Sequence, residues 1–152
     1  MTIIWKTVPI HECTETLIIN PMLKFHGAII GHPLDDFILH YHKEVYRKFA
    51  EIQPSFGSVQ YVRSKPFIFA NAVVGKRYGV DGFELNSWEI IRTLINIRSF
   101  AIEEDVLNDI AIALRSYTSV PGSEELIPVL KKIFADDTIV IYTGTRHTPD
   151  IC

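Results

Sequence analysis

The sequence lacks the features that mark several large classes of protein. Its two cysteines, Cys13 and Cys152, are too few for a disulfide framework and are not spaced as a metal-binding pair. No apolar run approaches the ~20 residues that a membrane-spanning helix needs. The N-terminal segment has no basic stretch followed by a long apolar run, so we expect no signal peptide. These features predict a reduced, cytoplasmic protein that has no membrane partner.

The sequence also has little net charge and no cluster of basic residues. The formal net charge is -3, and the 15 lysines and arginines are scattered along the chain. Nucleic-acid binding requires concentrated lysine and arginine to neutralise phosphates, so we expect no nucleic-acid partner. With 152 residues, 47% apolar and 22% charged, the chain fits one globular domain over 1–152, including a polar tail at 143–152. The oligomeric state is left open.

Apolar and β-branched runs alternate with amphipathic stretches along most of the chain. The predicted strands are 2–5, 16–20, 58–63, 66–74, 109–114 and 138–143. The predicted helices are 33–50, 86–100 and 123–134, and the main loops are 21–32, 75–82 and 115–122. Because the later strands alternate with helices, we predict an α/β fold, a three-layer α/β/α sandwich with a mixed central sheet.

Two of the predicted helices have clear start signals. Pro33 is suited to the first helical position, and Asp35 and Asp36 follow in the first turn, where carboxylates complement the positive helix end. Asn86 and Glu89 have the spacing of a capping box. The first helix has an apolar stripe that consists of Leu34, Phe37, Ile38, Tyr41, Val45 and Phe49.

The segment GHPLDDFILHYH at 31–42 raises the alternative of a metal site. In a continuous helix, His32, Asp36 and His40 would share one face, and imidazole with carboxylate is metal-ligand chemistry. However, Pro33 at the helix start leaves His32 outside regular helical geometry. Asp36 and His40 lie opposite the apolar stripe and should face solvent. We therefore favour a solvated face and predict neither a metal nor a cofactor.

Two loops favour a ligand site at the end of the sheet. In α/β sheets ligands bind beyond the carboxyl ends of the strands, here the loops after Asn20, Val74, Leu114 and Tyr142. Loops 21–32 and 115–122 each join a buried strand to a helix N-terminus, where backbone N–H groups attract anions. Together they are suited to hold a diphosphate between them. The alternative is two ordinary capped helices.

Several segments resemble a macrodomain. LIIN-PML-KFHGAIIG resembles the first signature of that family, a strand ending in Val-Asn followed by a glycine-bearing loop and a helix. KPFIFANAVVGKRYG looks like a second strand and loop of the family, with Asn71 at the strand end. DIAIALRSYTSVPGSEELIPVLKKIFADDTIVIYT is similar to its C-terminal strand, loop, helix and strand. The resemblance covers roughly residues 3–143.

The sequence departs from the macrodomain pattern at three places. The family's adenine-contacting aspartate is absent from 8–10, although Glu12 is nearby. Leu23 stands where the family has an asparagine that contacts the distal ribose. The second loop has one glycine, Gly122, where the family has two or more. These departures support a second hypothesis, a non-catalytic nucleotide-binding or protein-interaction module that has lost the pocket residues.

The resemblance implies binding of ADP-ribose or a related nucleotide. It also implies hydrolysis of a derivative such as ADP-ribose 1″-phosphate or an ADP-ribosyl conjugate, by phosphatase or ADP-ribosyl hydrolase chemistry. The candidate catalytic residues are Asn20, to orient a ribose hydroxyl, and His26 and His32, as acid or base near neutral pH. The candidate ligand-binding residues are Gly27, Gly31, Asn71, Ser116, Tyr117, Thr118, Ser119, Gly122 and Tyr142. The alternatives are exposed loop histidines and, for Tyr117 and Tyr142, core packing instead of stacking on a ligand ring.

Overall fold

A computed structural model describes residues 1–24, 27–28, 33–52, 54–78, 82–113 and 126–144. Its strands are β1 (Thr2–Lys6), β2 (Leu17–Lys24), β3 (Gly27–Ala28), β4 (Val59–Ser64), β5 (Phe67–Tyr78), β6 (Gly82–Leu85), β7 (Ile110–Ala113) and β8 (Thr138–Tyr142). Its helices are the 3₁₀ turn η1 (Ile10–Glu12), α1 (Pro33–Tyr41), α2 (Lys43–Ile52), α3 (Ser87–Glu103) and α4 (Leu126–Ile133).

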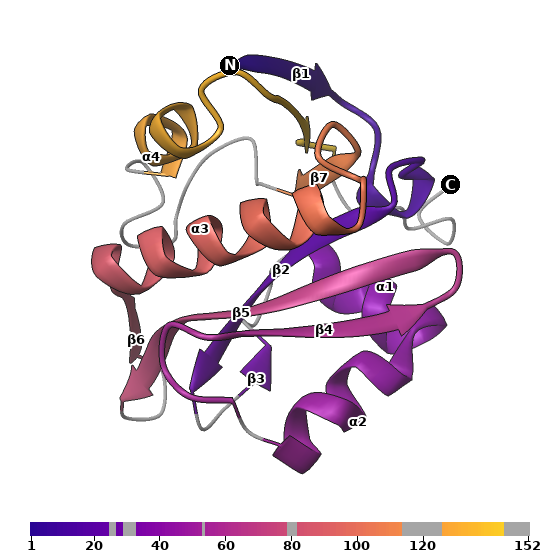
Figure 1. Cartoon of the computed structure of the whole chain (residues 1–152). Helices are drawn as coiled ribbons and strands as arrows, with labels where there is room; N and C mark the ends of the chain where they lie inside the picture. The colour runs from indigo at the N-terminus through magenta and orange to yellow at the C-terminus, as the bar shows by residue number, and fades with distance from the viewer. Residues whose placement is uncertain (25–26, 29–32, 53, 79–81, 114–125, 145–152) are drawn as a thin grey trace.

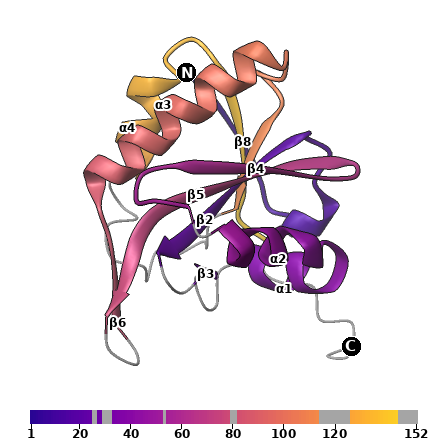
Figure 2. The same ribbon diagram turned by 60° about the horizontal axis from the view of Figure 1, so that its bottom comes forward.

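All of these strands belong to one mixed sheet. The order is β1-β8-β7-β2-β5-β4, in which β4 alone is antiparallel to its neighbour in this path. The short strands β3 and β6 pair antiparallel with the outer parts of β2 and β5. Helices α3 and α4 cover one face of the sheet, and α1 and α2 cover the other (Figures 1 and 2). The prediction of a three-layer α/β/α sandwich with a mixed sheet is therefore confirmed.

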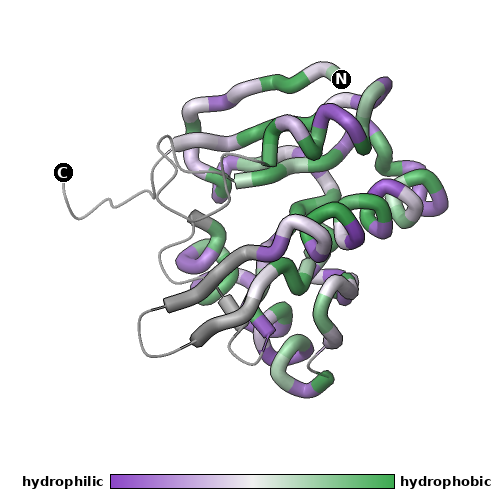
Figure 3. The backbone as a smooth tube through the Cα atoms, turned by 90° about the vertical axis from the view of Figure 1, so that its left-hand side faces the viewer, coloured by the Kyte–Doolittle hydropathy of each residue, from purple (hydrophilic) through white to green (hydrophobic). Residues whose placement is uncertain are grey.

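The sheet separates two apolar cores. Leu17 and Ile19 of β2 pack with α3 and α4, whereas Ile18 packs with α1 and α2, because successive strand side chains point to opposite faces. Both faces of the central strands are covered, which explains their nearly continuous apolar sequences. Apolar and hydrophilic residues alternate along the helical coils in Figure 3, as expected for helices with one face on a sheet.

Two strands extend further than the sequence predicts. β2 continues through Pro21 to Lys24, where we expected a loop. On one side β2 pairs with β7 up to Ile19 and with β3 from Met22. Pro21 therefore lies in the gap between these two partners, where its missing N–H interrupts neither ladder. β5 likewise continues to Tyr78, within the loop predicted at 75–82, because β6 pairs with its last four residues.

The single helix predicted at 33–50 is wrong, because the chain forms two helices separated by His42. His42 is buried, with its Nδ1 atom 2.6 Å from the hydroxyl oxygen of Ser64 and its ring against Phe37 and Phe69. Tyr41, which we placed on the apolar stripe, is exposed. The break after Tyr41 changes the helical register, so that the imidazole instead of the phenol reaches the sheet.

The predicted start of α3 is confirmed. The side chain of Asn86 accepts a hydrogen bond from the backbone N–H of Glu89 at 3.2 Å, as an N-cap does. The described part of the last helix begins at Leu126, and the predicted start at Ser123 lies outside the described residues. Within the described ranges, no helix combines the length and the apolar character needed to cross a membrane.

Candidate site on β2 and β5

Asn20 and Asn71 meet where two parallel strands run side by side. β2 and β5 are neighbours in the sheet, and Asn20 is the register partner of Asn71. The Nδ2 atom of Asn20 donates a hydrogen bond to Oδ1 of Asn71 over 2.8 Å. Their side chains are 2% and 0% exposed. The structure thus brings together two of the predicted site residues and encloses both.

The pair continues into a third amide that the sequence analysis did not identify. Asn71 donates from Nδ2 to Oε1 of Gln60 on β4 over 3.1 Å, and Gln60 donates from Nε2 to the backbone carbonyl of Lys48 in α2 over 3.0 Å. Gln60 is the register partner of Asn71 across the antiparallel pair of β4 and β5. We refer to Asn20, Asn71 and Gln60 as the amide row. No local sequence signal indicates it, because it depends on the register of strands that are far apart in sequence.

The position of the missing family asparagine is filled by a buried apolar side chain. Leu23 is 1% exposed and is the register partner of Gly27 on β3. Gly27 belongs to this short strand, in a segment that the sequence predicts to be loop. The leucine side chain has no hydrogen-bonding group, so it offers only apolar contacts.

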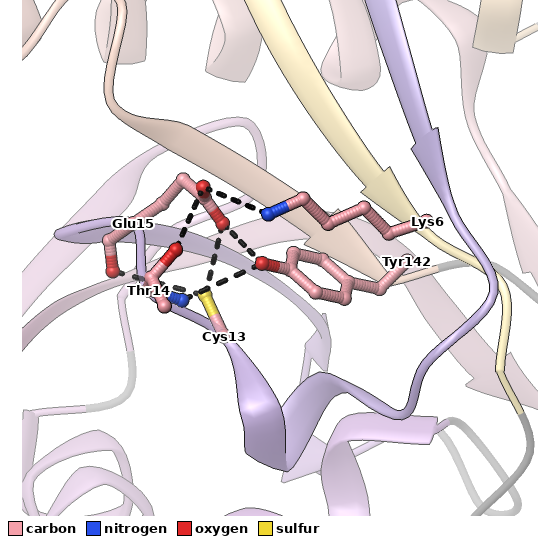
Figure 4. Close-up of polar contacts among 5 residues, drawn as sticks. All are labelled: Lys6, Cys13, Thr14, Glu15 and Tyr142. Atoms are coloured by element: carbon pink, nitrogen blue, oxygen red, sulfur yellow. Dashed lines mark hydrogen bonds and ion pairs between the residues drawn. The ribbon is translucent and has the colours of Figure 1, made fainter.

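Tyr142 belongs to a second polar cluster, which the sequence analysis also missed (Figure 4). Its ring is 1% exposed, and its hydroxyl donates to Oε1 of Glu15. The same carboxylate accepts from the Cys13 thiol at 3.5 Å and the Thr14 hydroxyl at 3.3 Å, and it lies 3.9 Å from Nζ of Lys6. Four side chains thus converge on one nearly buried carboxylate, on the same side of the sheet as α1 and α2.

The environment of this Glu15 cluster shifts three pKa values. Burial raises the pKa of the Cys13 thiol to about 12, which keeps it protonated at neutral pH. Burial also raises the pKa of Tyr142, and the hydrogen bond to the Glu15 carboxylate adds to this effect. For Glu15, burial acts in the raising direction, but the hydrogen bond from Tyr142 and the charge of Lys6 outweigh it and lower the pKa. The cluster therefore holds a buried carboxylate in its ionised form.

The remaining predicted site residues lie outside the described residues. These are His26, Gly31, His32, Ser116, Tyr117, Thr118, Ser119 and Gly122. Among the residues of the rejected metal alternative, His40 is exposed, as predicted, and Asp36 is partly exposed. No three histidine, cysteine, aspartate or glutamate side chains within the described ranges are grouped so that they would hold a metal ion.

The arrangement defines a three-layer α/β protein with a row of amide side chains across the neighbouring strands β2, β5 and β4. No protein-family model and no curated protein matches the sequence. Solved structures, however, match nearly its whole length. Against the macrodomain of Thermus aquaticus DarG, the TM-score is 0.73 at 14% identity, over 94% of this chain and 99% of that one.

Two further structures support the same assignment of fold. A macrodomain protein from Streptomyces coelicolor has a TM-score of 0.66 at 14% identity, over 93% of this chain and 99% of that chain. Thermosipho africanus DarTG, solved in complex with ADP-ribose, has a TM-score of 0.71 at 10% identity, over 99% of this chain and 44% of that chain. The chain therefore has the macrodomain fold, and the resemblance seen in its sequence extends to three dimensions.

Proposed function

We propose that this protein binds ADP-ribose or a related nucleotide and hydrolyses an ADP-ribose derivative, such as ADP-ribose 1″-phosphate or an ADP-ribosyl conjugate. The observation that carries the proposal is the macrodomain fold, which it shares with a protein solved in complex with ADP-ribose. The fold supports the proposal in a second way. Ligands of α/β sheets bind beyond the carboxyl ends of the strands, and the segments proposed to hold the diphosphate follow β2 and β7. The cytoplasmic location expected from the sequence stays a prediction.

In this proposal the diphosphate lies between the segments that follow β2 and β7. Asn20, in the middle of β2, orients a ribose hydroxyl, and Asn71 holds Asn20 in place through their 2.8 Å hydrogen bond. His26 or His32 supplies the acid or base, and the backbone and hydroxyl groups of 115–122 contact the phosphates. Tyr142 does not stack on the ligand in this proposal, since its ring is enclosed and its hydroxyl is bound to Glu15.

A second candidate is a nucleotide-binding or protein-interaction module without catalysis. It is favoured by Leu23, a fully buried apolar side chain at the place where the family has a ribose-contacting asparagine. A site that lacks a hydrogen-bonding partner for a substrate group loses part of the orientation that hydrolysis needs.

Calorimetric titration with ADP-ribose and a phosphate-release assay on ADP-ribose 1″-phosphate separate these functions. Binding with turnover supports the enzyme, and binding without turnover, tested also on an ADP-ribosylated protein, supports the non-catalytic module. If ADP-ribose does not bind at all, the nucleotide proposal is wrong and an interaction role remains.

Three variants locate the binding site. We expect Asn20→Ala and Gly27→Glu each to weaken ADP-ribose binding about tenfold or more. The first removes the amide that orients the ribose hydroxyl, and the second places a carboxylate near the phosphates. His40→Ala is the matched control, because His40 is exposed on α1. This variant should bind ADP-ribose with the affinity of the wild type. Loss of binding in the His40 variant, restored by zinc, would revive the metal alternative.

A further inference from the structure

The hydrogen bonds of the amide row all run in one direction. A carboxamide has an NH₂ donor side and a carbonyl acceptor side, so each member can in principle be turned either way. Here each NH₂ group points away from β2, from Asn20 to Asn71, from Asn71 to Gln60, and from Gln60 to the Lys48 carbonyl. The row therefore has a donor end at α2 and an acceptor end at β2.

Two backbone carbonyls of α2 fix this direction. The carbonyl of Lys48 can only accept, so Gln60 must present its NH₂ group to it and its oxygen to Asn71. The carbonyl of Val45 lies 3.5 Å from Nδ2 of Asn71 and imposes the same orientation on that amide. Turning the buried Asn71 amide around would place its oxygen against the Gln60 oxygen and the Val45 carbonyl, which costs free energy in a buried site. For the partly exposed Gln60, the same turn would place its oxygen against the Lys48 carbonyl.

The fixed orientation of the Asn71 amide also determines the orientation of the Asn20 amide. Its NH₂ group donates to Asn71 at 2.8 Å and to the Met22 sulfur at 3.2 Å, so both donor hydrogens are used. Its carbonyl oxygen is then directed away from β5. On that side the pairing of β2 with β7 stops at Ile19, and the pairing with β3 begins at Met22. Asn20 thus presents an acceptor at the point where the neighbouring strand ends.

We infer that Gln60 is a positioning residue which, through Asn71, fixes the Asn20 carboxamide with its carbonyl oxygen turned away from β5, toward the side of β2 where the pairing with β7 stops. The inference rests on the proposed function and deepens it, because a fixed acceptor selects a ligand group that donates, such as a ribose hydroxyl. Gln60 does not contact the ligand. It transmits the orientation set by α2 across β4 and β5 to β2.

The test replaces the donor side of Gln60 by a group that titrates. In Gln60→Glu the ionised carboxylate has no hydrogen to give to the Lys48 carbonyl, so the row loses its anchor. Protonation restores one donor and one acceptor. We expect ADP-ribose affinity, relative to wild type at each pH, to be about tenfold lower at about pH 8 and to recover in part at about pH 4.5, where a glutamate is partly protonated. Gln60→Leu should bind weakly at both pH values.

Asn96→Asp is the matched control. It makes the same amide-to-carboxylate change on the exposed side of α3, where the Tyr61 hydroxyl donates to Oδ1 and finds the same acceptor after the change. Its affinity relative to wild type should not vary with pH. Calorimetry measures the dissociation constant of the folded protein. If Gln60 only stabilised the fold, its substitution would change the unfolding temperature but not the affinity relative to wild type.

Side-chain amide signals in NMR test the row without any ligand. We expect the NH₂ protons of Asn20 and Asn71 to exchange slowly with water in the wild type. At about pH 8 they should exchange faster in Gln60→Glu than in the wild type at the same pH. If exchange and relative affinity are both unaffected by Gln60→Glu, the inference is overturned. If the wild type does not bind ADP-ribose, the proposed function fails, and slow exchange that Gln60→Glu abolishes would still establish the positioning role.

Discussion

At the scale of single residues, the Glu15 cluster makes stability depend on pH. The lowered pKa of Glu15 means that the folded state favours the ionised carboxylate. The resulting stabilisation is fully present above the ordinary pKa of 4.5 and is lost as the pH falls through the lower pKa of the folded state. Tyr142 is the largest stabilising contributor to this shift, because its hydroxyl donates directly to the carboxylate.

Tyr142→Phe should therefore be most harmful at neutral pH. Losing a hydrogen bond to a charged group costs roughly 1.5–3 kcal/mol, and the cost should shrink as the pH falls through the lowered pKa of Glu15 and the carboxylate becomes neutral. Urea unfolding of wild type and variant across this range measures the difference in free energy of unfolding. Tyr61→Phe is the control, because Tyr61 donates to the neutral amide of Asn96 and its cost should not vary with pH. If Tyr142→Phe costs the same free energy of unfolding at neutral and at acidic pH, the hydroxyl of Tyr142 does not donate to an ionised carboxylate.

The thiol of Cys13 gives a second prediction at this scale. It is buried, and its pKa is raised to about 12, so almost no thiolate is present at neutral pH. We expect iodoacetamide to modify Cys13 very slowly in the native protein and rapidly in denaturant, with the adduct located by mass spectrometry of peptides. Rapid modification of the native protein would show that the cluster opens readily.

At the scale of elements, the turn before β4 depends on one glycine. Gly57 has φ of +77°, a conformation that costs an L-residue about 1–2 kcal/mol. A Cβ atom there would also lie 1.8 Å from Oε2 of Glu89, which pairs with Arg92 at the start of α3. The turn and the first turn of α3 are thus packed against each other at this point.

We expect Gly57→Ala to lower the free energy of unfolding by about 1–2 kcal/mol, and the melting temperature by roughly 3–6 °C. Gly57→Asn separates the two causes, because asparagine tolerates positive φ better than alanine but carries the same Cβ. If alanine and asparagine are equally harmful, displacement of Glu89 is the cause. If neither changes the melting temperature, the turn is not constrained as described.

The elements that could be predicted from sequence are those whose signal is local. The apolar strands and the Asn86 cap were found because their patterns lie within a few residues. The break at His42 could not be found, because it depends on the buried Ser64 hydroxyl and on aromatic rings of β5 that lie beside it only in the folded chain. The extension of β2 through Pro21 was missed for the same reason, since it depends on where β7 and β3 begin and end.

At the scale of the whole molecule, the sequence predicts the layers but not their connections. Alternating strands and helices are enough to predict a sandwich, whereas the order β1-β8-β7-β2-β5-β4 follows from packing between distant segments. The same limit applies to the site. Asn20 was predicted from the end of an apolar run and Asn71 from the resemblance to a macrodomain. Gln60, Glu15 and Cys13 were not predicted, because their partners lie on other elements.

Because one sheet supports both apolar cores, a ligand held at its carboxyl end should stabilise the molecule as a unit. Binding to the folded state at a free concentration of about 100 times the dissociation constant adds about 2.7 kcal/mol. For a domain of this size that corresponds to a rise in melting temperature of roughly 5–10 °C. We expect this rise with ADP-ribose in a thermal unfolding experiment, and a much smaller one with ribose 5-phosphate, which lacks the diphosphate and the adenine. Equal shifts with the two compounds would show that a phosphate alone accounts for the binding, and no shift at millimolar ADP-ribose would contradict a nucleotide site.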